Sequence, residues 1–348
     1  MGNDFKKANI WAHHIFTEQD LRAFLYLILI SSITLPLHAH AKICQETRLG
    51  FDIGSGSTKM LVAKVDFCEH KIVEVLHSES RSIAFNEDLE KNKDNKLSPA
   101  IIEVGLKNLQ EMTAKGRSFK PKKIYGVATS VFRKSHNGVD VIKGYAKKLG
   151  IKLEVIAQTD EAMLGYLSAR SATNEKNIVV WDIGGGSMQM WSQVDDKKPL
   201  VYLGDLASVT FKNMVIEVIQ LKDTQSVSSP NPIGDKRDQI ILLAKSYAKL
   251  HVNAELKKAI SELSVYGVGG VHSQSIKNQL QLKEMKYTLE EITRGSATQV
   301  LKSDSELTGN YRATDVTNLL LVQGFMEGLG IKEVKLVDAT LLQGVVLR

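Results

Sequence analysis

The sequence has few of the residues that mark specialised classes of protein. Its 348 residues include only 2 cysteines and 6 prolines, with 25 glycines and 6% aromatic residues. These low counts exclude collagen-like, low-complexity and disulfide-dense chains. Hydrophobic residues make up 43% of the chain and charged residues 24%, which is typical of a soluble globular protein. The length predicts two lobes, each able to bury its own core.

The sequence also lacks any long block of like charge. Lys and Arg number 45 and Asp and Glu 39, so the net charge is only +6. This mild excess suits an anionic small ligand or polymer and does not indicate a dedicated nucleic-acid binder. The histidines and cysteines do not stand at the spacing of a zinc site, so we expect none.

One apolar run is long enough to have a targeting role. Residues 23–37 are uncharged, follow a segment with basic residues, and precede the small-residue pattern Ala-His-Ala at 39–41. This arrangement predicts a secretory signal peptide, residues 1–41, cleaved after Ala41. The run is short for a membrane span, and Pro36 ends it. We therefore expect a periplasmic or secreted protein without a stable membrane span after cleavage; the alternative is an uncleaved signal anchor.

Export makes the two cysteines informative. Cys44 and Cys68 would pair in an oxidising compartment, joining the new N-terminus to the end of the first hairpin. Two free or buried thiols are the alternative, and the sequence does not decide between them.

Two glycine-rich segments have the same pattern. Residues 49–59 (LGFDIGSGSTK) and 178–187 (IVVWDIGGGS) each predict a strand that ends in Asp-Ile-Gly-x-Gly-Ser and is followed by a second strand. Asp52 and Asp182 occupy the same place in the two copies. A duplicated structural unit explains the repeat.

Such turns suit an anion. Glycine allows close backbone approach, so that successive N–H groups can converge on phosphate, and hydroxyl groups add donors. Asp52 and Asp182 at the strand ends can hold a hydrated Mg²⁺ that bridges phosphate oxygens. A P-loop would need a helix after the turn, whereas a strand follows here. The phosphate-binding candidates are Gly54, Ser55, Gly56, Ser57 and Thr58 in the first turn and Gly184, Gly185, Gly186 and Ser187 in the second.

These motifs resemble the paired phosphate loops of the actin/hexokinase/Hsp70 superfamily. Further motifs resemble the exopolyphosphatase/guanosine pentaphosphate phosphatase (Ppx/GppA) family in its short, single-unit form, over about residues 48–348. They are Ala-Thr-Ser-Val-Phe-Arg at 128–133, Asp-Glu-Ala at 160–162, Gly-Val-Gly-Gly at 267–270, Tyr-Arg-Ala-Thr-Asp at 311–315 and Leu-Gln-Gly at 342–344. The resemblance implies an α/β fold with two actin-like (ribonuclease-H-like) lobes, 42–172 and 173–348, and a ligand cleft between them.

The resemblance also implies roles for single residues. Glu161 matches the carboxylate that serves as general base in the family, although an acidic residue near a helix start also has a merely structural explanation. Arg133 offers a bidentate fork for phosphate, and its alternative is a surface arginine beside Lys134. Gly269 and Gly270 match a later glycine turn of the phosphate site.

One residue departs from the family pattern. The second loop of the family ends Gly-Gly-Gly-Ser-Thr-Glu, whereas this chain has Gln189 in place of the glutamate. The change removes a carboxylate that could help bind a metal, while the amide can still form hydrogen bonds. Secreted apyrase-type nucleotidases of the same superfamily typically carry glutamine at this place.

Taken with the resemblance, the motifs predict a Mg²⁺-dependent hydrolase of phosphoanhydride bonds that releases terminal orthophosphate from inorganic polyphosphate or a related compound. An exported nucleoside tri- or diphosphate hydrolase and a non-catalytic phosphate- or nucleotide-binding protein are the alternatives. The sequence leaves the oligomeric state open, with a homodimer among the options.

Two local expectations concern the first lobe. The charged residues at 87–96 (EDLEKNKDNK) predict a solvated loop. The pair Ser98-Pro99 predicts the capped start of an amphipathic helix.

Overall fold

The computed structural model describes residues 44–348, except 174, 195–196 and 309–310. The predicted signal peptide, residues 1–41, lies outside the described residues. Within them, none of the helices combines the length and the apolar character needed to cross a membrane.

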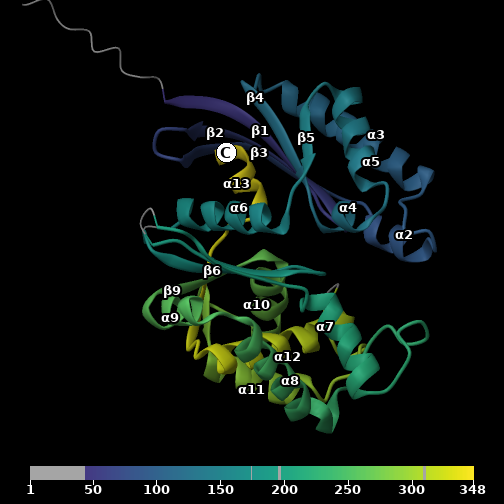
Figure 1. Cartoon of the computed structure of the whole chain (residues 1–348), viewed down its shortest axis with the longest axis vertical. Helices are drawn as coiled ribbons and strands as arrows, with labels where there is room; N and C mark the ends of the chain where they lie inside the picture. Colours follow the sequence, from purple (N-terminus) through teal and green to yellow (C-terminus); the bar gives the residue numbers. More distant parts are fainter. Residues whose placement is uncertain (1–43, 174, 195–196, 309–310) are drawn as a thin grey trace, which may run out of the picture. The chain divides into compact units, whose positions relative to one another are not determined.

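Two β-sheets organise the described chain (Figure 1). The first has the strand order β3-β2-β1-β4-β5 and the second the order β10-β11-β9-β6-β7-β8. The first sheet contains β1 (Gln45–Ile53), β2 (Ser57–Asp66), β3 (Lys71–Ser82), β4 (Lys123–Ala128) and β5 (Lys152–Val155). The second contains β6 (Ile178–Ile183), β7 (Met188–Ser192), β8 (Leu200–Gly204), β9 (Ser264–Val268), β10 (Lys286–Thr288) and β11 (Glu333–Leu336).

Helices follow and cover these strands. Around the first sheet they are α2 (Phe85–Lys91), α3 (Pro99–Arg117), α4 (Ser130–Lys134), α5 (Gly138–Leu149) and α6 (Gln158–Ser171). The later ones are α7 (Ser208–Met214), η1 (Val215–Ile219), η2 (Gly234–Lys236), α8 (Arg237–His251), α9 (Ala254–Glu262), η3 (Val271–Ile276), α10 (Lys277–Leu280), α11 (Leu289–Gln299), α12 (Arg312–Leu329) and α13 (Leu341–Leu347).

The two sheets repeat one topology. In the first, β1, β2 and β3 form an antiparallel meander, and β4 pairs parallel to β1 on its other side. In the second, β6, β7 and β8 form the same meander, and β9 pairs parallel to β6. The duplication predicted from the two glycine turns is therefore present in the strand order, and the predicted two-lobed α/β architecture is confirmed.

Each sheet has its own apolar core. Leu49, Phe51 and Ile53 of β1 are buried and pack with residues of α3 and α5. The larger core lies on the second sheet, where α12 is buried along most of its length and packs against α8. Gly324 permits this packing, because a Cβ there would lie 2.5 Å from the Cβ of Ala244. Two independent cores are what a chain of this length was expected to form.

Helix α13 packs on the first sheet although it lies in the half of the sequence assigned to the second lobe. Its contacts are with β1, β2 and α6. Leu342, Val346 and Leu347 form one buried cluster with apolar residues of β2. A Cβ on Gly50 would lie only 2.6 Å from Cγ1 of Val346, so glycine at this strand position allows the helix to approach. The first lobe therefore includes residues from both ends of the described chain.

The charged stretch at 87–96 is not simply a loop, and this expectation was wrong. Residues up to Lys91 belong to α2, because Phe85 and Leu89 are both buried and lie one helical turn apart. The Asp88 carboxylate accepts hydrogen bonds from the backbone N–H and the hydroxyl of Ser98. The predicted helix after Ser98 is confirmed, since the Ser98 side chain accepts from the Ile101 N–H.

Cys44 and Cys68 form a disulfide. The bond joins residues on either side of the β1–β2 hairpin, since Cys44 directly precedes β1 and Cys68 follows the end of β2. Of the two alternatives that the sequence left open, the structure has the bridged one. A closed loop of this length restricts the unfolded chain and favours the folded state.

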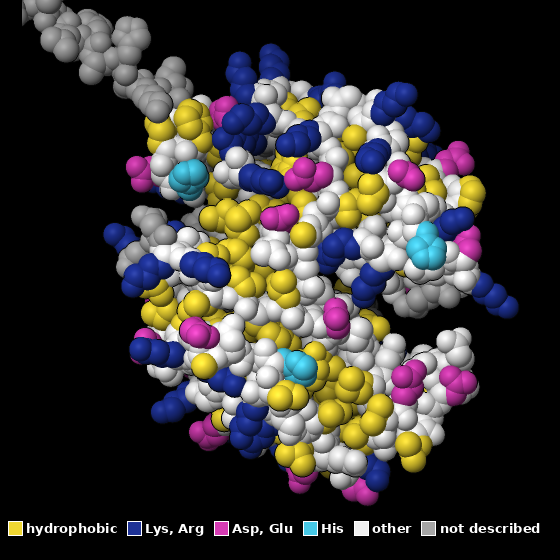
Figure 2. Space-filling model, in the orientation of Figure 1, with side chains coloured by type: hydrophobic (Ala, Val, Ile, Leu, Met, Phe, Trp, Pro, Cys, Tyr) yellow, Lys and Arg dark blue, Asp and Glu magenta, His cyan; other side chains and the backbone are white. Residues whose placement is uncertain are grey.

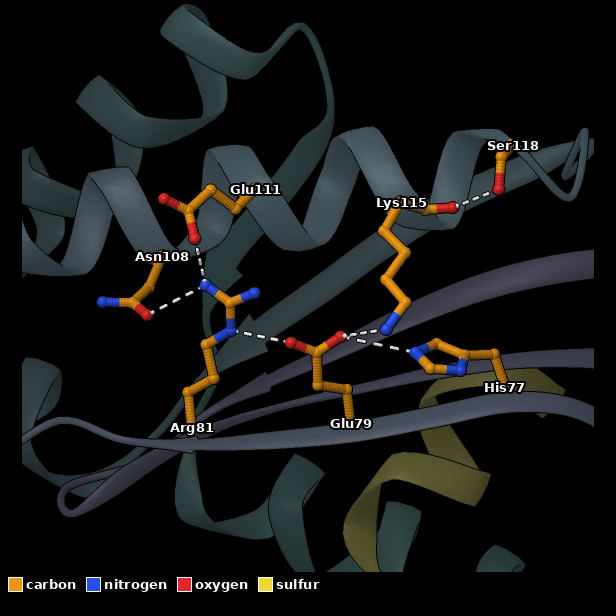
Figure 3. Close-up of polar contacts among 7 residues, drawn as sticks. All are labelled: His77, Glu79, Arg81, Asn108, Glu111, Lys115 and Ser118. Carbon is orange, nitrogen blue, oxygen red and sulfur yellow. Dashed lines mark hydrogen bonds and ion pairs between the residues drawn. The ribbon is translucent and has the colours of Figure 1, made fainter.

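An ionic network joins edge strand β3 to α3 (Figure 3). The Glu79 carboxylate accepts from Arg81 Nε at 2.7 Å and from Lys115 Nζ at 3.2 Å. Arg81 also pairs with Glu111 of α3 at 2.5 Å. The hydrogen bond from Arg81 is the largest influence in lowering the pKa of Glu79 to about 2. The network fixes α3 across the outer face of the sheet.

Glu79→Gln should therefore lower stability in a pH-dependent way. The folded-state pKa of Glu79 lies below its ordinary value of 4.5, so its contribution is present above that value and is lost as the pH falls towards 2. We expect the unfolding free energy at pH 7 to fall by about 1 kcal/mol, with solvent screening limiting the effect. Urea unfolding from pH 7 to pH 3 measures the difference. Glu74→Gln, at an exposed position of the same strand, is the control. Equal pH profiles for both variants would contradict the assignment.

Candidate functional site

The two glycine turns have matching geometry. The Gly54 N–H donates to the Ser57 carbonyl at 2.9 Å, and the Gly184 N–H donates to the Ser187 carbonyl at 2.9 Å. Both turns join the first two strands of their sheet, as predicted. The hairpin register places Asp52 opposite Lys59 in the first sheet and Asp182 opposite Gln189 in the second.

Each turn is held from outside by the helix that follows the third strand of its sheet. The Ser55 carbonyl accepts from the Asn86 N–H of α2 at 3.0 Å, and the Gly185 carbonyl accepts from the Val209 N–H of α7 at 2.8 Å. The turn backbones are thus fixed in the same way in both halves. Fixed backbone amides suit anion binding, because little ordering is needed when the ligand arrives.

Asp52 is a buried carboxylate at the end of β1. Its side chain lies 3.7 Å from the ammonium of Lys59. Burial raises the pKa of Asp52, and the neighbouring Lys59 charge opposes this rise. Lys59 was not among the predicted site residues, although the hairpin register gives a reason to expect it there.

Asp182 occupies the equivalent position at the end of β6. Burial is the main cause that raises its pKa to about 7, and the negative charges of Glu161 and Asp52 add to the effect. A Cβ on Gly269 would lie 2.3 Å from Asp182 Oδ1, and Gly269 has φ of +84°. Position 269 therefore requires glycine for both its backbone conformation and its contact with the carboxylate. Gly270 begins the turn into η3 directly after it.

Glu161 and Arg133 form an ion pair. Arg133 Nη1 lies 2.8 Å from Glu161 Oε2 and also donates to the Ile156 carbonyl at 3.0 Å. Glu161 lies in the first turn of α6 and Arg133 in α4. Burial raises the pKa of Glu161, while the Arg133 charge opposes the rise. The structure thus places the two predicted catalytic residues in direct contact.

Gln189 is a buried member of the second hairpin. Its Nε2 donates to Ser187 Oγ at 3.2 Å. Because the amide donates to this oxygen, the Ser187 hydroxyl hydrogen is left to point elsewhere. Thr58, the last residue predicted in the first turn, has a fully buried hydroxyl without a hydrogen-bond partner in the described residues. The Ser187 hydroxyl is therefore free to donate to an anion, and the Thr58 hydroxyl has no acceptor among the described residues.

The second turn also approaches α4. A Cβ on Gly186 would lie 3.0 Å from Lys134 Nζ and 3.7 Å from Ser130 Oγ. Lys134 and Ser130 belong to the first half of the chain and Gly186 to the second. Sequence reasoning named Lys134 only as a neighbour of Arg133, since no local pattern indicates a contact between positions 52 residues apart.

The carboxylates fit a hydrated cation. Asp52, Asp182 and Glu161 influence one another electrostatically, and carboxylate oxygens are the ligands that Mg²⁺ prefers. Within the described residues, the one group of three side chains whose possible metal-ligand atoms lie close together is Cys44, Asp66 and Cys68. The three carboxylates of this site are not as close to one another as that. The cysteines of that group are bonded to each other. Asp52 and Asp182 are the carboxylates that would hold Mg²⁺ at this site.

A separate cavity of about 360 Å³ lies at the opposite end of the first sheet from these turns. Basic side chains of Arg48, Lys123, Lys152 and Arg348 surround Tyr125 there. Figure 2 shows Lys and Arg side chains mixed with hydrophobic ones in the part of the surface near β1 and β4. Three of these cations already pair with carboxylates, Arg48 and Lys123 with Glu46 and Arg348 with Glu154. The cleft expected between the lobes stays a prediction.

Gly269→Ala should disturb the Asp182 carboxylate. The new methyl group would occupy space 2.3 Å from Oδ1, and the positive φ adds backbone strain. Gly150→Ala is the matched control, because Gly150 has φ of +62° but open space around its Cβ position. We expect a stability loss of about 1 kcal/mol for both from backbone strain, and a further loss together with weaker Mg²⁺ and phosphate binding for Gly269→Ala alone. Thermal unfolding and calorimetric titration measure these effects. Equal behaviour of the two variants would contradict the contact.

Comparison with known proteins identifies relatives over part of the sequence. A model of the Ppx/GppA phosphatase family matches residues 61–224. A bifunctional 3-dehydroquinate synthase/phosphatase of Fusobacterium nucleatum is 26% identical over 66% of this chain and 33% of its own length. Exopolyphosphatase 1 of Mycobacterium leprae is 35% identical over 20% of this chain and 21% of its own. The matches thus span about a third or less of the length of these curated relatives.

Solved structures agree over most of the chain. A Ppx/GppA family member from Aquifex aeolicus has a TM-score of 0.68 at 16% identity, covering 87% of this chain and 97% of its own. An exopolyphosphatase from Cytophaga hutchinsonii has a TM-score of 0.65 at 16% identity, covering 86% and 96%. At such identity these likenesses establish the two-lobed actin-like fold. Together with the family match over residues 61–224 and the paired Asp-Ile-Gly turns, they make this chain similar to the Ppx/GppA phosphatase family.

Proposed function

We propose that the protein hydrolyses phosphoanhydride bonds and releases terminal orthophosphate from inorganic polyphosphate or a related polyphosphorylated compound. The observation that carries this proposal is the ion pair between Glu161 and Arg133, which lies in a site with Asp52 and Asp182 at the ends of the two turn-forming strands. The match to the Ppx/GppA family model and the curated exopolyphosphatase relatives support the same reaction class.

The turns would bind the phosphate chain. Backbone N–H groups of the two glycine turns and the hydroxyl groups of Thr58 and Ser187 are donors, and phosphate oxygens are acceptors. Mg²⁺ held by Asp52 and Asp182 would neutralise phosphate charge and orient the terminal group. The donors are fixed by hydrogen bonds outside the turns, so that the site is ordered before the substrate binds.

Glu161 would accept a proton from the attacking water. Burial raises its pKa, and a carboxylate with a raised pKa is a better base. Arg133 holds this carboxylate in place and its charge opposes the rise in pKa, while its remaining N–H groups are available to a phosphate oxygen. Water attack on the terminal phosphorus would then release orthophosphate without a covalent intermediate.

Gln189 favours a second candidate, an exported hydrolase of nucleoside tri- or diphosphates. The buried amide in place of the family's glutamate reduces the negative charge next to Ser187 and resembles apyrase-type nucleotidases. Binding of phosphate or nucleotide without turnover is a third possibility. The first two candidate functions differ in the substrate from which phosphate is released, and the third releases none. The assay below separates the three.

We also propose that the protein acts outside the cytoplasm. The apolar run at 23–37 and the Ala-His-Ala pattern support a cleaved signal peptide. The Cys44–Cys68 disulfide supports an oxidising compartment, because thiols in the cytosol are kept reduced. Substrate would then be polyphosphate or nucleotide present in that compartment.

Phosphate release tests the function. With Mg²⁺, we expect the purified protein to release orthophosphate from polyphosphate faster than from ATP or GTP. Glu161→Gln should lower kcat by roughly 10²–10⁴-fold, because glutamine cannot accept the proton, while the affinity for polyphosphate changes little. Glu103→Gln, an exposed substitution on α3, is the control.

The competing outcomes are distinct. Faster release from nucleotides would favour the apyrase-like candidate. Binding of polyphosphate without release would favour the non-catalytic one. If Glu161→Gln retains most of the rate of an active enzyme, the base lies elsewhere.

Export has its own test. Mass spectrometry of extracytoplasmic protein should give an N-terminus at Lys42, and alkylation without reductant should label neither Cys44 nor Cys68. Alkylation after reduction of the unfolded protein, which should label both, is the control. An intact Met1 on the mature protein would contradict cleavage, and labelling of both thiols before reduction would contradict the bridge.

A further inference from the structure

The cations around the two turns differ in their partners. Arg133 is engaged by Glu161, and Lys59 faces Asp52. Lys134 is exposed, and no carboxylate in the described part of the chain lies within ion-pairing distance of its ammonium. Among the residues that the structure describes, the Lys134 charge therefore has no ion-pair partner, although its ammonium lies beside the second turn.

The position of Lys134 is fixed by its backbone. Val131 and Phe132 anchor α4 in the first core, and the Ser135 N–H closes the helix on the Val131 carbonyl. The Lys134 carbonyl accepts from Asn95 Nδ2 at 2.9 Å. The backbone at 134 is thus held from two sides, while the side chain extends towards Gly186.

The absence of a side chain at Gly186 permits this approach. A Cβ there would lie 3.0 Å from Lys134 Nζ, closer than a methyl group and an ammonium normally come. The ammonium therefore lies at the level of the turn backbone, where an anion bound by the second turn would also lie. Ser130 Oγ, 3.7 Å from the same point, adds a hydroxyl from the same helix.

We propose that Lys134 is a phosphate-binding residue of this site, and that it contributes a positive charge from α4 to a phosphoryl group held by the second turn. The proposal rests on the proposed function in placing phosphate at that turn, and it goes further by naming a ligand from the opposite half of the chain. A phosphoryl group bound in this way joins the two halves, since the turn donates from one side and Lys134 from the other. Gln189 stands where the family pattern has a carboxylate that could help bind a metal. Lys134 would therefore take over part of the neutralisation of phosphate charge that a metal ion would otherwise supply.

The test measures binding of a phosphate ligand separately from its hydrolysis. The probe is imidodiphosphate, whose P–N–P bridge is not hydrolysed, titrated calorimetrically into the full chain with and without Mg²⁺. We expect Lys134→Met to weaken binding by roughly ten- to hundredfold, because it removes a charged contact and keeps the length of the side chain. Lys134→Arg should restore most of the affinity. Lys143→Met, at an exposed position of α5, should bind as the wild type does.

The salt dependence gives a second readout. Loss of one phosphate contact should reduce the slope of log affinity against log salt for Lys134→Met but not for Lys143→Met, and thermal unfolding of both variants should match the wild type. Equal affinity of Lys134→Met and the wild type would overturn the proposal, as would a wild type that does not bind the probe. A wild type that binds the probe through Lys134 but releases no phosphate from any substrate would support the phosphate contact and overturn the proposed hydrolase.

Discussion

The burial of three acidic side chains near one another is the constraint on which the site depends. Asp52 is buried and Asp182 and Glu161 are partly buried, and the pKa values of all three are raised, chiefly by that burial. Such an arrangement is costly unless positive charge is supplied. The protein supplies some of it through Lys59 and Arg133. Under the proposed function, a cation that binds together with the substrate would supply the remainder. The site would then bind a metal–phosphate ligand in preference to phosphate alone.

The sheet topology explains how residues from distant parts of the sequence reach this place. Asp52 and Asp182 end equivalent strands of two repeated units, and each turn is tied to the helix after the third strand of its own unit. Glu161 lies in the first turn of α6, which packs on the second sheet and against α13. A repeated unit thus supplies two similar glycine turns, while Arg133 of α4, after β4, and Glu161 of α6, after β5, come from outside these turns.

The sequence was sufficient for features encoded by local patterns. The Asp-Ile-Gly turns and the helix capped by Ser98 depend on residues that are neighbours in the chain, and the structure contains both. Residues 87–96 were expected to be a loop because of their many charges, whereas the burial of Phe85 and Leu89 makes the residues up to Lys91 helical. Contacts between distant segments left no local pattern. The approach of Lys134 to Gly186 and the placement of α13 on the first sheet follow from tertiary packing alone.

The packing of α13 also bears on the order of folding. The first sheet begins at Gln45, yet the helix that covers part of β1 and β2 is formed by residues 341–347. During synthesis, Leu61, Ala63 and Val65 must wait for almost three hundred residues before Leu342 and Val346 shield them from water. The bond between Cys44 and Cys68 joins residues only 24 apart, so its formation does not require α13. A disulfide at this place would hold the hairpin together while its apolar face still lacks its cover, the stage at which exposed apolar strands are prone to wrong associations.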